Sequence, residues 1–314
     1  MAGLTTDIKE QALLLGFSKI GIARAGRLEA ESKRLDEWLV RGYDAGMKWM
    51  AERRDKRIDP RTLLPGAKSV VSVALNYYTP ARHAEDPAAG KISRYAWGDD
   101  YHDIVKDRLD KLLEFILSQR PEASGKAYVD TGPVMDKAWA QRAGIGWQGK
   151  HTNLITEEFG SWVFLGEILL DLELEYDNPA LDLCGNCTLC IEACPTDAIT
   201  EAYVVDSNRC ISYLTIEHRG SIAEELGEKF GGWIYGCDIC QDVCPWNIRD
   251  SRPSNVREFY PRPENVEPEL SGVAELSQRA FSARFKKSPI KRAKREGMIR
   301  NARIAMAASS KDAP

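Results

Sequence analysis

Three features that are common in exported and membrane proteins are missing from this chain of 314 residues. No stretch approaches the roughly 18 consecutive apolar residues that a membrane-spanning helix needs. The N-terminus reads MAGLTTDIKEQALLLGF and contains neither the apolar core of a secretory signal peptide nor a twin-arginine sequence. Cysteine is absent from residues 1–183 and from residues 245–314. We therefore expect a cytoplasmic protein without membrane segments.

All eight cysteines are confined to the 61 residues between Cys184 and Cys244. The first four have the spacing CxxCxxCxxxCP, and the last three repeat its CxxCxxxCP part after the isolated Cys210. This spacing is typical of bacterial ferredoxins, where three neighbouring thiolates bind one [4Fe–4S] cluster and the fourth thiolate binds the other cluster. The candidate ligands are Cys184, Cys187, Cys190, Cys194, Cys210, Cys237, Cys240 and Cys244.

The ferredoxin rule predicts how these thiolates divide between two clusters. One cluster is expected to be bound by Cys184, Cys187, Cys190 and Cys244, and the other by Cys194, Cys210, Cys237 and Cys240. A disulfide framework and two zinc sites are the alternatives. Disulfides fit poorly in a chain of this size without a secretory signal. Zinc sites use CxxC pairs but seldom this longer run.

The charge is distributed unevenly along the chain. The whole sequence carries a net charge of −4, with hydrophobic and charged fractions of 43% and 29% that are ordinary for a globular protein. Between Arg279 and Arg303, however, ten lysines and arginines face one acidic residue, Glu296, which gives that segment a net charge of +9. Such a segment favours a polyanionic partner such as RNA or DNA. The alternative is a solvated helical face.

Strands and helices are predicted to alternate in the first half of the chain. Helices are expected at residues 5–15, 29–41, 47–54, 101–119 and 134–143, and strands at residues 19–23, 69–75, 126–129, 153–155 and 162–169. The alternation predicts an α/β (α+β) domain at residues 1–177. A ferredoxin-like module with two clusters is expected at residues 178–255, and a linker with a short basic helical tail at residues 256–314.

A glycine motif at residues 144–149 matches the GxGxxG fingerprint of dinucleotide-binding proteins. That fingerprint requires a strand before it and a helix after it, and here the predicted order is the reverse. Dinucleotide binding is therefore disfavoured. The glycines are expected to let the backbone approach a large ligand, with Lys150 nearby for a phosphate or amide.

Two polar segments with aromatic residues stand out in the first domain, at residues 93–103 and 128–133. The second contains Asp130, directly after a predicted strand and before a Gly-Pro turn. Ligands of α/β folds gather at the carboxyl ends of strands, which makes Asp130 a candidate active-site residue. The alternative is that Asp130 caps the following helix.

These segments, together with the cysteine spacing, resemble the epoxyqueuosine reductase family. The resemblance extends from the first helix to about residue 250 and includes the sequences RYAWG at 94–98, DYH at 100–102, VDTG at 129–132 and QRAGIGW at 141–147. It implies an oxidoreductase that reduces epoxyqueuosine to queuosine at the tRNA wobble position, in a fold related to reductive dehalogenases. The implied cofactors are cobalamin and two [4Fe–4S] clusters, which would pass electrons to the cobalt and generate the Co(I) state that attacks the epoxide.

The resemblance also implies roles for individual residues. Asp130 would be the general acid for the leaving oxygen, with its pKa raised by burial against the corrin face. Ser93 would lie near the cobalt. His102 is in a sequence that begins like a cobalamin-binding DxHxxG motif, but Val105 replaces the glycine, so cobalamin is expected without a histidine ligand. Further candidate cofactor contacts are Arg57, Arg94, Trp97, Arg142, Lys150 and Ser212.

The resemblance implies tRNA with a GUN anticodon as substrate and a reduced donor of the flavodoxin or ferredoxin type, with the chain itself monomeric. Longer family members continue into helical repeats that help to hold tRNA, whereas this sequence stops at Pro314. The basic segment is therefore expected to supply phosphate contacts. The alternatives are a cobalamin-dependent reductase like the reductive dehalogenases, a non-catalytic ferredoxin-like electron carrier, and an RNA-binding module with structural clusters.

Overall fold

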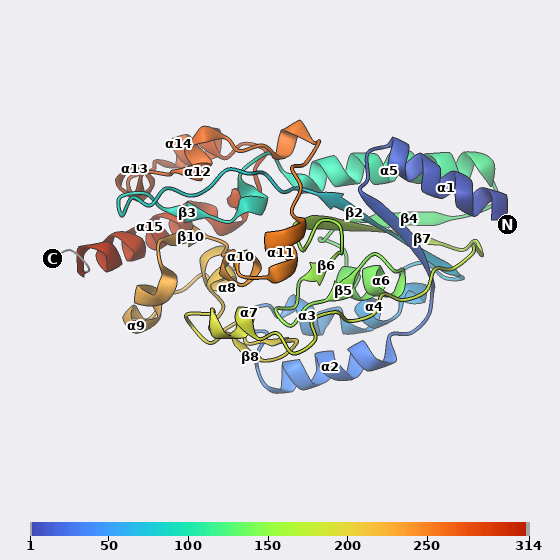
Figure 1. Ribbon diagram of the computed structural model, residues 1–314, viewed down its shortest axis with the longest axis horizontal. Coiled ribbons are helices and arrows are strands. Elements are labelled where there is room, and N and C mark those ends of the chain that lie inside the picture. The colour runs from blue at the N-terminus through green and yellow to red at the C-terminus, as the bar shows by residue number, and fades with distance from the viewer. Residues whose placement is uncertain (1, 312–314) are drawn as a thin grey trace.

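The computed structural model describes residues 2–311, and a four-stranded sheet forms the core of its N-terminal half (Figure 1). The strand order is β1 (Lys19–Arg24), β2 (Ser69–Asn76), β7 (Val163–Leu170) and β4 (Gly125–Tyr128). Every neighbouring pair is antiparallel. All residues of β2 are buried, as its β-branched sequence indicates. The predicted mixture of strands and helices is confirmed, and the antiparallel pairing makes this half an α+β arrangement.

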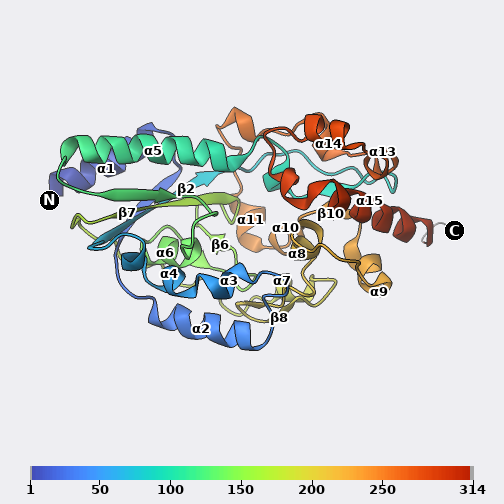
Figure 2. The ribbon, with the colours of Figure 1, turned by 180° about the vertical axis from the view of Figure 1, so that it is seen from behind.

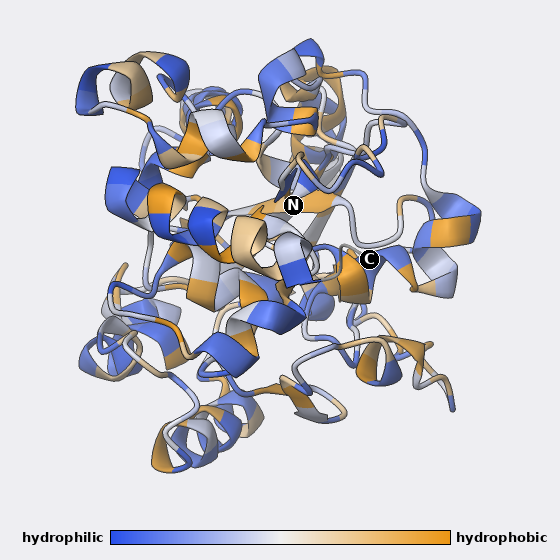
Figure 3. Cartoon of the chain, turned by 90° about the vertical axis from the view of Figure 1, so that its left-hand side faces the viewer, coloured by the Kyte–Doolittle hydropathy of each residue, from blue (hydrophilic) through white to orange (hydrophobic). Residues whose placement is uncertain are grey.

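Helices cover both faces of the sheet. α1 (Ala2–Leu14) and α5 (Tyr101–Gln119) pack on one face, and α6 (Asp136–Arg142) packs on the other. Because side chains alternate along a strand, Val71 joins the core under α1 and α5, whereas Val70 joins the core under α6. In Figure 3 the central strands are predominantly hydrophobic, and the peripheral helices mix hydrophobic with hydrophilic residues. The side of α6 also carries α2 (Glu29–Val40), α3 (Trp49–Glu52), α4 (Arg54–Ile58) and η1 (Pro60–Thr62).

The cysteine-bearing segments form short elements beside the sheet (Figure 1). Each cysteine run contains one turn of helix, α7 (Leu189–Glu192) in the first and α10 (Ile239–Asp242) in the second. β10 (Trp233–Tyr235) pairs in parallel with β3 (Lys91–Ile92), which joins this region to the N-terminal half. The other elements are β5 (Trp147–Gln148), β6 (Leu154–Ile155), β8 (Ile199–Glu201), β9 (Val204–Val205), α8 (Ile211–Ile216), α9 (Glu224–Gly227), α11 (Pro245–Asp250), η2 (Arg94–Ala96) and η3 (Glu228–Phe230).

The basic tail is helical and packs onto the rest of the molecule (Figure 2). α15 (Lys294–Lys311) contacts α13 (Leu270–Ala274), and its Met298 shares a hydrophobic core with Trp97 and Tyr235. The tail is therefore an integral part of the fold. It is preceded by η4 (Arg257–Phe259), α12 (Pro263–Val266), α14 (Gln278–Arg284) and η5 (Pro289–Ala293).

Most predicted elements of the first half are confirmed to within three residues at each end, and the bounds predicted for α5 are those observed. The single helix predicted at residues 47–54 is wrong, because the backbone leaves the helical region at Arg53 and separates α3 from α4. Within residues 2–311, no helix is both long enough and apolar enough to span a membrane.

Candidate active site

A cavity lies between the sheet and the cysteine-bearing segments. It contains about 1400 Å³ of empty space, including its open mouth. Part of its lining comes from the sheet and the loops around it, including Tyr77, Phe164 and Asp130. Another part contains four of the eight cysteines, Cys194, Cys210, Cys237 and Cys240. The fold thus brings the candidate acid and half of the candidate cluster ligands to one cavity.

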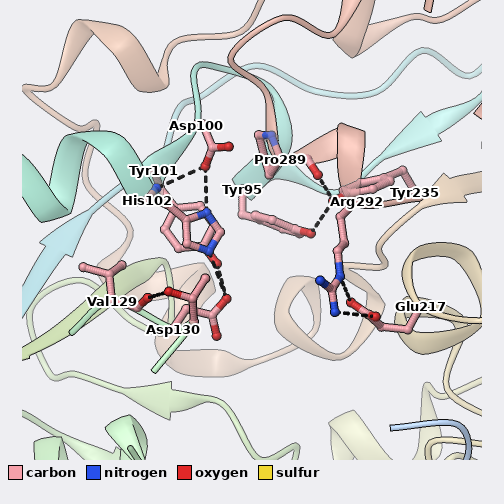
Figure 4. A network of polar contacts seen from close by, with 11 residues as sticks. Tyr95, Asp100, Tyr101, His102, Val129, Asp130, Glu217, Tyr235, Pro289 and Arg292 are labelled. Carbon is pink, nitrogen blue, oxygen red and sulfur yellow. Dashed lines mark hydrogen bonds and ion pairs between the residues drawn. The ribbon is translucent and has the colours of Figure 1, made fainter. Parts of the chain in front are cut away.

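Asp130 belongs to a group of hydrogen-bonded side chains, Asp100, Tyr101, His102 and Asp130, which we call the acid cluster (Figure 4). The Tyr101 hydroxyl donates to Asp130 Oδ2 at 2.6 Å, and His102 Nε2 lies 3.2 Å from the same oxygen. His102 Nδ1 lies 2.7 Å from Asp100 Oδ1, so the ring is held between two carboxylates. The capping alternative for Asp130 is wrong, because α6 begins only at Asp136.

Near neutral pH the proton of the acid cluster is on His102. Burial alone would lower the pKa of His102, but the hydrogen bonds and charges of Asp100 and Asp130 raise it to about 9. Burial would raise the pKa of Asp130, but its bonds to His102 and Tyr101 and nearby positive charge lower it overall. In this structure the Asp130 side chain is 58% exposed and lies beside His102, so the rise in pKa expected from burial against the corrin stays a prediction.

The eight cysteines form no disulfide. We call the four that line the cavity the inner thiols and the four outside its lining the outer thiols. The inner thiols are Cys194, Cys210, Cys237 and Cys240, and the outer thiols are Cys184, Cys187, Cys190 and Cys244. Burial and then the other outer thiols raise the pKa of Cys190 to about 11, whereas Cys237 has inner thiols as its cysteine neighbours. In residues 2–311 no group of three His, Cys, Asp or Glu side chains is arranged to hold a single metal ion.

A buried aspartate connects the inner thiols to the cavity wall. Asp238 directly follows Cys237, is fully buried, and accepts hydrogen bonds from Ser93 Oγ and from the Arg94 backbone N–H at 2.7 Å. The backbone beside it also approaches Ser93 closely, since a Cβ on Gly236 would lie 2.4 Å from the Ser93 Cβ. These contacts fix Ser93 against the loop that carries two inner thiols.

Only some of the predicted cofactor contacts line the cavity, namely Ser93, Asp130 and Ser212. Trp97 is completely buried, and its Nε1 donates to Ile92 O at 2.8 Å. The Arg94 guanidinium carbon lies 4.6 Å from the centre of a Trp97 ring. Both residues belong to the packed interior, which corrects their prediction as cofactor contacts.

The lining also leaves out Arg57, Arg142 and Lys150. Arg142 forms an ion pair with Glu31 at 3.0 Å. Lys150 Nζ donates to the carbonyl oxygens of Gly185 and Cys187, at 2.7 and 2.9 Å, and so contacts the loop of the outer thiols. Arg57 is only 9% exposed and lies over an aromatic ring. In this structure the three cations therefore contact protein groups rather than the cavity.

The glycines of the 144–149 motif permit contact between backbone segments. A Cβ on Gly146 would lie 2.1 Å from Ile155 O, and one on Gly144, whose φ is +75°, would lie 2.7 Å from Asn178 O. Because both obstacles are backbone carbonyls of the chain itself, the expected approach of a ligand at Gly144 and Gly146 is wrong.

Sequence reasoning missed His151, which lines the cavity and is 4% exposed. Burial lowers the pKa of His151 to about 4, so the ring is neutral near pH 7. Its Nδ1 accepts a hydrogen bond from Asn153 N at 3.2 Å, which leaves the ring proton on Nε2. Nε2 has no hydrogen-bond partner in the described part of the chain. The position of His151 directly after Lys150, in a segment already suspected of binding, is the signal that could have indicated it.

The basic segment borders the acid cluster. Lys287 O accepts from the Asp100 backbone N–H at 2.9 Å, and Arg292 pairs with Glu217 at 2.7 Å nearby (Figure 4). Other arginines of the segment bond to backbone carbonyls, namely Arg284, Arg295 and Arg300. Six further cations are exposed and have no side-chain hydrogen bond or ion pair within the described residues: Arg279, Lys286, Lys287, Lys291, Lys294 and Arg303.

Comparison with protein families gives two matches. The family described as epoxyqueuosine reductase QueG, DUF1730, matches residues 57–131, and the 4Fe-4S double cluster binding domain matches residues 183–247. The curated epoxyqueuosine reductase of Leadbetterella byssophila is 50% identical over 301 residues, which cover 96% of this chain and 98% of that protein. The curated epoxyqueuosine reductase of Cellulophaga algicola is 47% identical over 294 residues, which cover 94% and 95%.

Solved structures of epoxyqueuosine reductases have the same fold. One contains an epoxyqueuosine-modified tRNA-Tyr stem loop; it is 35% identical with a TM-score of 0.90, over 98% of this chain and 82% of that one. The Bacillus subtilis structure is 33% identical, with the same TM-score of 0.90 and the same coverage of 98% and 82%. It was solved with a catalytic loop that carries an aspartate swung out of the active site.

Proposed function

The chain belongs to the epoxyqueuosine reductase family, and we infer that it reduces epoxyqueuosine in tRNA to queuosine. The reaction adds electrons and protons to the epoxide, leaves an alkene and releases the oxygen as water. One observation supports this function beyond the family likeness: a single cavity is lined by Asp130 of the acid cluster and by all inner thiols. Anaerobic incubation with epoxyqueuosine tRNA, cobalamin and a strong reductant tests the inference, and absence of queuosine from the nucleoside analysis would overturn it.

We assign one [4Fe–4S] cluster to the outer thiols and one to the inner thiols. The double-cluster family match spans all eight cysteines, which supports the assignment. Electrons would then enter at the outer cluster and leave from the inner cluster, which borders the cavity. Four exposed hydrophobic side chains lie near the outer thiols in the sequence: Leu181, Leu183, Leu189 and Ile248. Such a surface suits a protein electron donor of the flavodoxin or ferredoxin type.

The cavity residues fit a bound cobalamin. Much of the lining is apolar, including Phe164, Leu165 and Ile211, and His151 offers an unpartnered Nε2–H donor for a polar group on the cofactor. Both ring nitrogens of His102 already face carboxylates, which supports cobalamin without a His102 ligand. When bound, cobalamin supplies a low-potential cobalt centre that accepts single electrons and can attack carbon. Ser93 and Ser212 would contact it from the side of the inner thiols.

We assign the general acid to Asp130. At neutral pH the lowered pKa of Asp130 keeps its carboxylate ionised, and the raised pKa of His102 keeps the neighbouring imidazole protonated. His102 would hold the proton at Nε2, 3.2 Å from Asp130 Oδ2, and Asp130 would hand it to the leaving oxygen. Asp130 has a φ of +46°, a left-handed backbone conformation that non-glycine residues seldom adopt. Such conformations concentrate at active sites, which agrees with this role.

We propose that the unpaired cations of the basic segment contact tRNA phosphates. Lys287 bonds through its carbonyl to Asp100, which brings this segment beside the acid cluster. Phosphate contacts orient RNA without reading its sequence, so recognition of a GUN anticodon would depend on other groups. Binding that is insensitive to salt would contradict this role. A cytoplasmic location and a monomeric enzyme complete the proposal.

A further inference from the structure

The glycine motif at residues 144–149 contains a buried tryptophan to which the proposed reaction gives no role. Its Trp147 is 1% exposed and packs in one hydrophobic cluster with Cys184 and Cys244, both of them outer thiols. Trp147 Nε1 is buried and has no hydrogen-bond partner in residues 2–311. A buried N–H without an acceptor costs about 1–3 kcal/mol, so native proteins seldom leave one unmatched. The unmatched donor therefore points to an acceptor that is part of the outer site.

Donors from the same loop converge on Cys184. The backbone N–H of Lys150 and the indole N–H of Trp147 both approach the Cys184 sulfur. The Lys150 ammonium donates to Gly185 O at 2.7 Å and so holds the loop of the outer thiols in place. The indole N–H therefore lies near the Cys184 sulfur without completing a hydrogen bond to the free thiol.

We propose that Trp147 Nε1–H donates a hydrogen bond to a sulfur of the cluster bound by the outer thiols and thereby raises the reduction potential of that cluster. One-electron reduction makes the cluster more negative, and a fixed donor stabilises the more negative form more strongly. The outer cluster thus takes up an electron more readily. The inference rests on the cluster assignment of the proposed function, and Trp147 tunes the cluster without touching the substrate.

The test compares two tryptophan variants of the reconstituted enzyme with both clusters and cobalamin. Trp147→Phe keeps an aromatic ring and removes the donor. Trp246→Phe is the matched control. The Trp246 ring packs edge-on against Trp147, with 4.7 Å between the ring centres, but Trp246 contacts the Cys244 thiol through its backbone N–H, which the substitution retains. In a redox titration followed by EPR, Trp147→Phe should make one cluster roughly tenfold harder to reduce, which is about 59 mV for one electron. The other cluster, and both clusters of Trp246→Phe, should keep their potentials.

Unchanged potentials in Trp147→Phe, or an equal shift in Trp246→Phe, would overturn the role of Trp147. If Trp147→Phe does not assemble its clusters, wild-type protein with isotope-labelled indole nitrogen replaces it. Pulsed EPR of the reduced protein should then detect hyperfine coupling from one indole nitrogen, and its absence would reject the hydrogen bond. Failure of the wild-type protein to bind two clusters would instead reject the cluster assignment itself.

Discussion

The acid cluster and the inner thiols serve one cavity, but they are held in place by different means. Two of the inner thiols are held together by covalent spacing, since Cys237 lies three residues before Cys240, which is part of the single turn of α10; Cys194 and Cys210 come from earlier segments. The acid cluster instead joins the start of α5 to the loop after β4, and its members meet only through hydrogen bonds. Changing a thiol should therefore remove a whole redox centre, whereas changing an acid-cluster residue should redistribute a proton.

The largest effect is expected from the thiols, and it separates the inner set from the outer set. Cys240→Ala and Cys187→Ala should each lower the iron content from about eight to about four atoms per chain. Cys240→Ala should lose turnover with every reductant, because no cluster would then border the cavity. Cys187→Ala should lose turnover with a protein donor and recover part of it with a small strong reductant that reaches the inner cluster. Iron analysis and anaerobic turnover measure both effects.

The reverse pattern would exchange the two assignments. If Cys240→Ala responded to the small reductant and Cys187→Ala did not, the outer thiols would be the set that delivers electrons to the cavity. Equal loss in both variants under all reductants would contradict a sequential path from the outer to the inner cluster.

A smaller effect is expected at the acid cluster. Asp130→Asn should lower turnover by about 10²- to 10⁴-fold, the usual contribution of a general acid, because the amide cannot transfer the proton. Cluster content and cobalamin binding should remain unchanged, as absorption spectra and iron analysis would record. Asp103→Asn, an exposed charge change in the first turn of α5, is the control. Full activity of Asp130→Asn would eliminate Asp130 as the acid.

The histidine should set the alkaline limit of the reaction. His102 has a pKa raised from 6.5 to about 9, so turnover should be level near neutral pH and fall as the pH rises through about 9. The same shift stabilises the fold below pH 6.5, and this contribution is lost through pH 9. His102→Asn should lower turnover about tenfold, equivalent to about 1.4 kcal/mol from one hydrogen bond to a charged group, and remove the alkaline limb. An unchanged pH profile in His102→Asn would contradict the proton store.

The two sides of the cavity also differ in how far the sequence predicts them. The cysteine spacing matches the ferredoxin pattern, so the division into two sets could be predicted from that pattern although each set joins cysteines distant in sequence. The identity of Asp130 as a cavity residue follows from its motif, but its pKa does not, because His102 comes from a different segment. Arg94 and Trp97 were predicted as cofactor contacts because they belong to the RYAWG motif, but the motif does not indicate that both side chains are buried.

The smallest effect is expected in tRNA binding. Its measurement tests whether the substrate approaches the cavity from the side of the acid cluster. Lys287 is exposed and its carbonyl bonds to Asp100, so phosphates should approach from the acid side. Lys286→Ala with Lys287→Ala should weaken binding of an epoxyqueuosine stem loop a few-fold and reduce the slope of log affinity against log salt by about one unit per lysine. Lys111→Ala on α5, an exposed lysine paired with Asp107, should leave the slope unchanged. The same slope in all variants would mean that tRNA approaches the cavity without the basic segment.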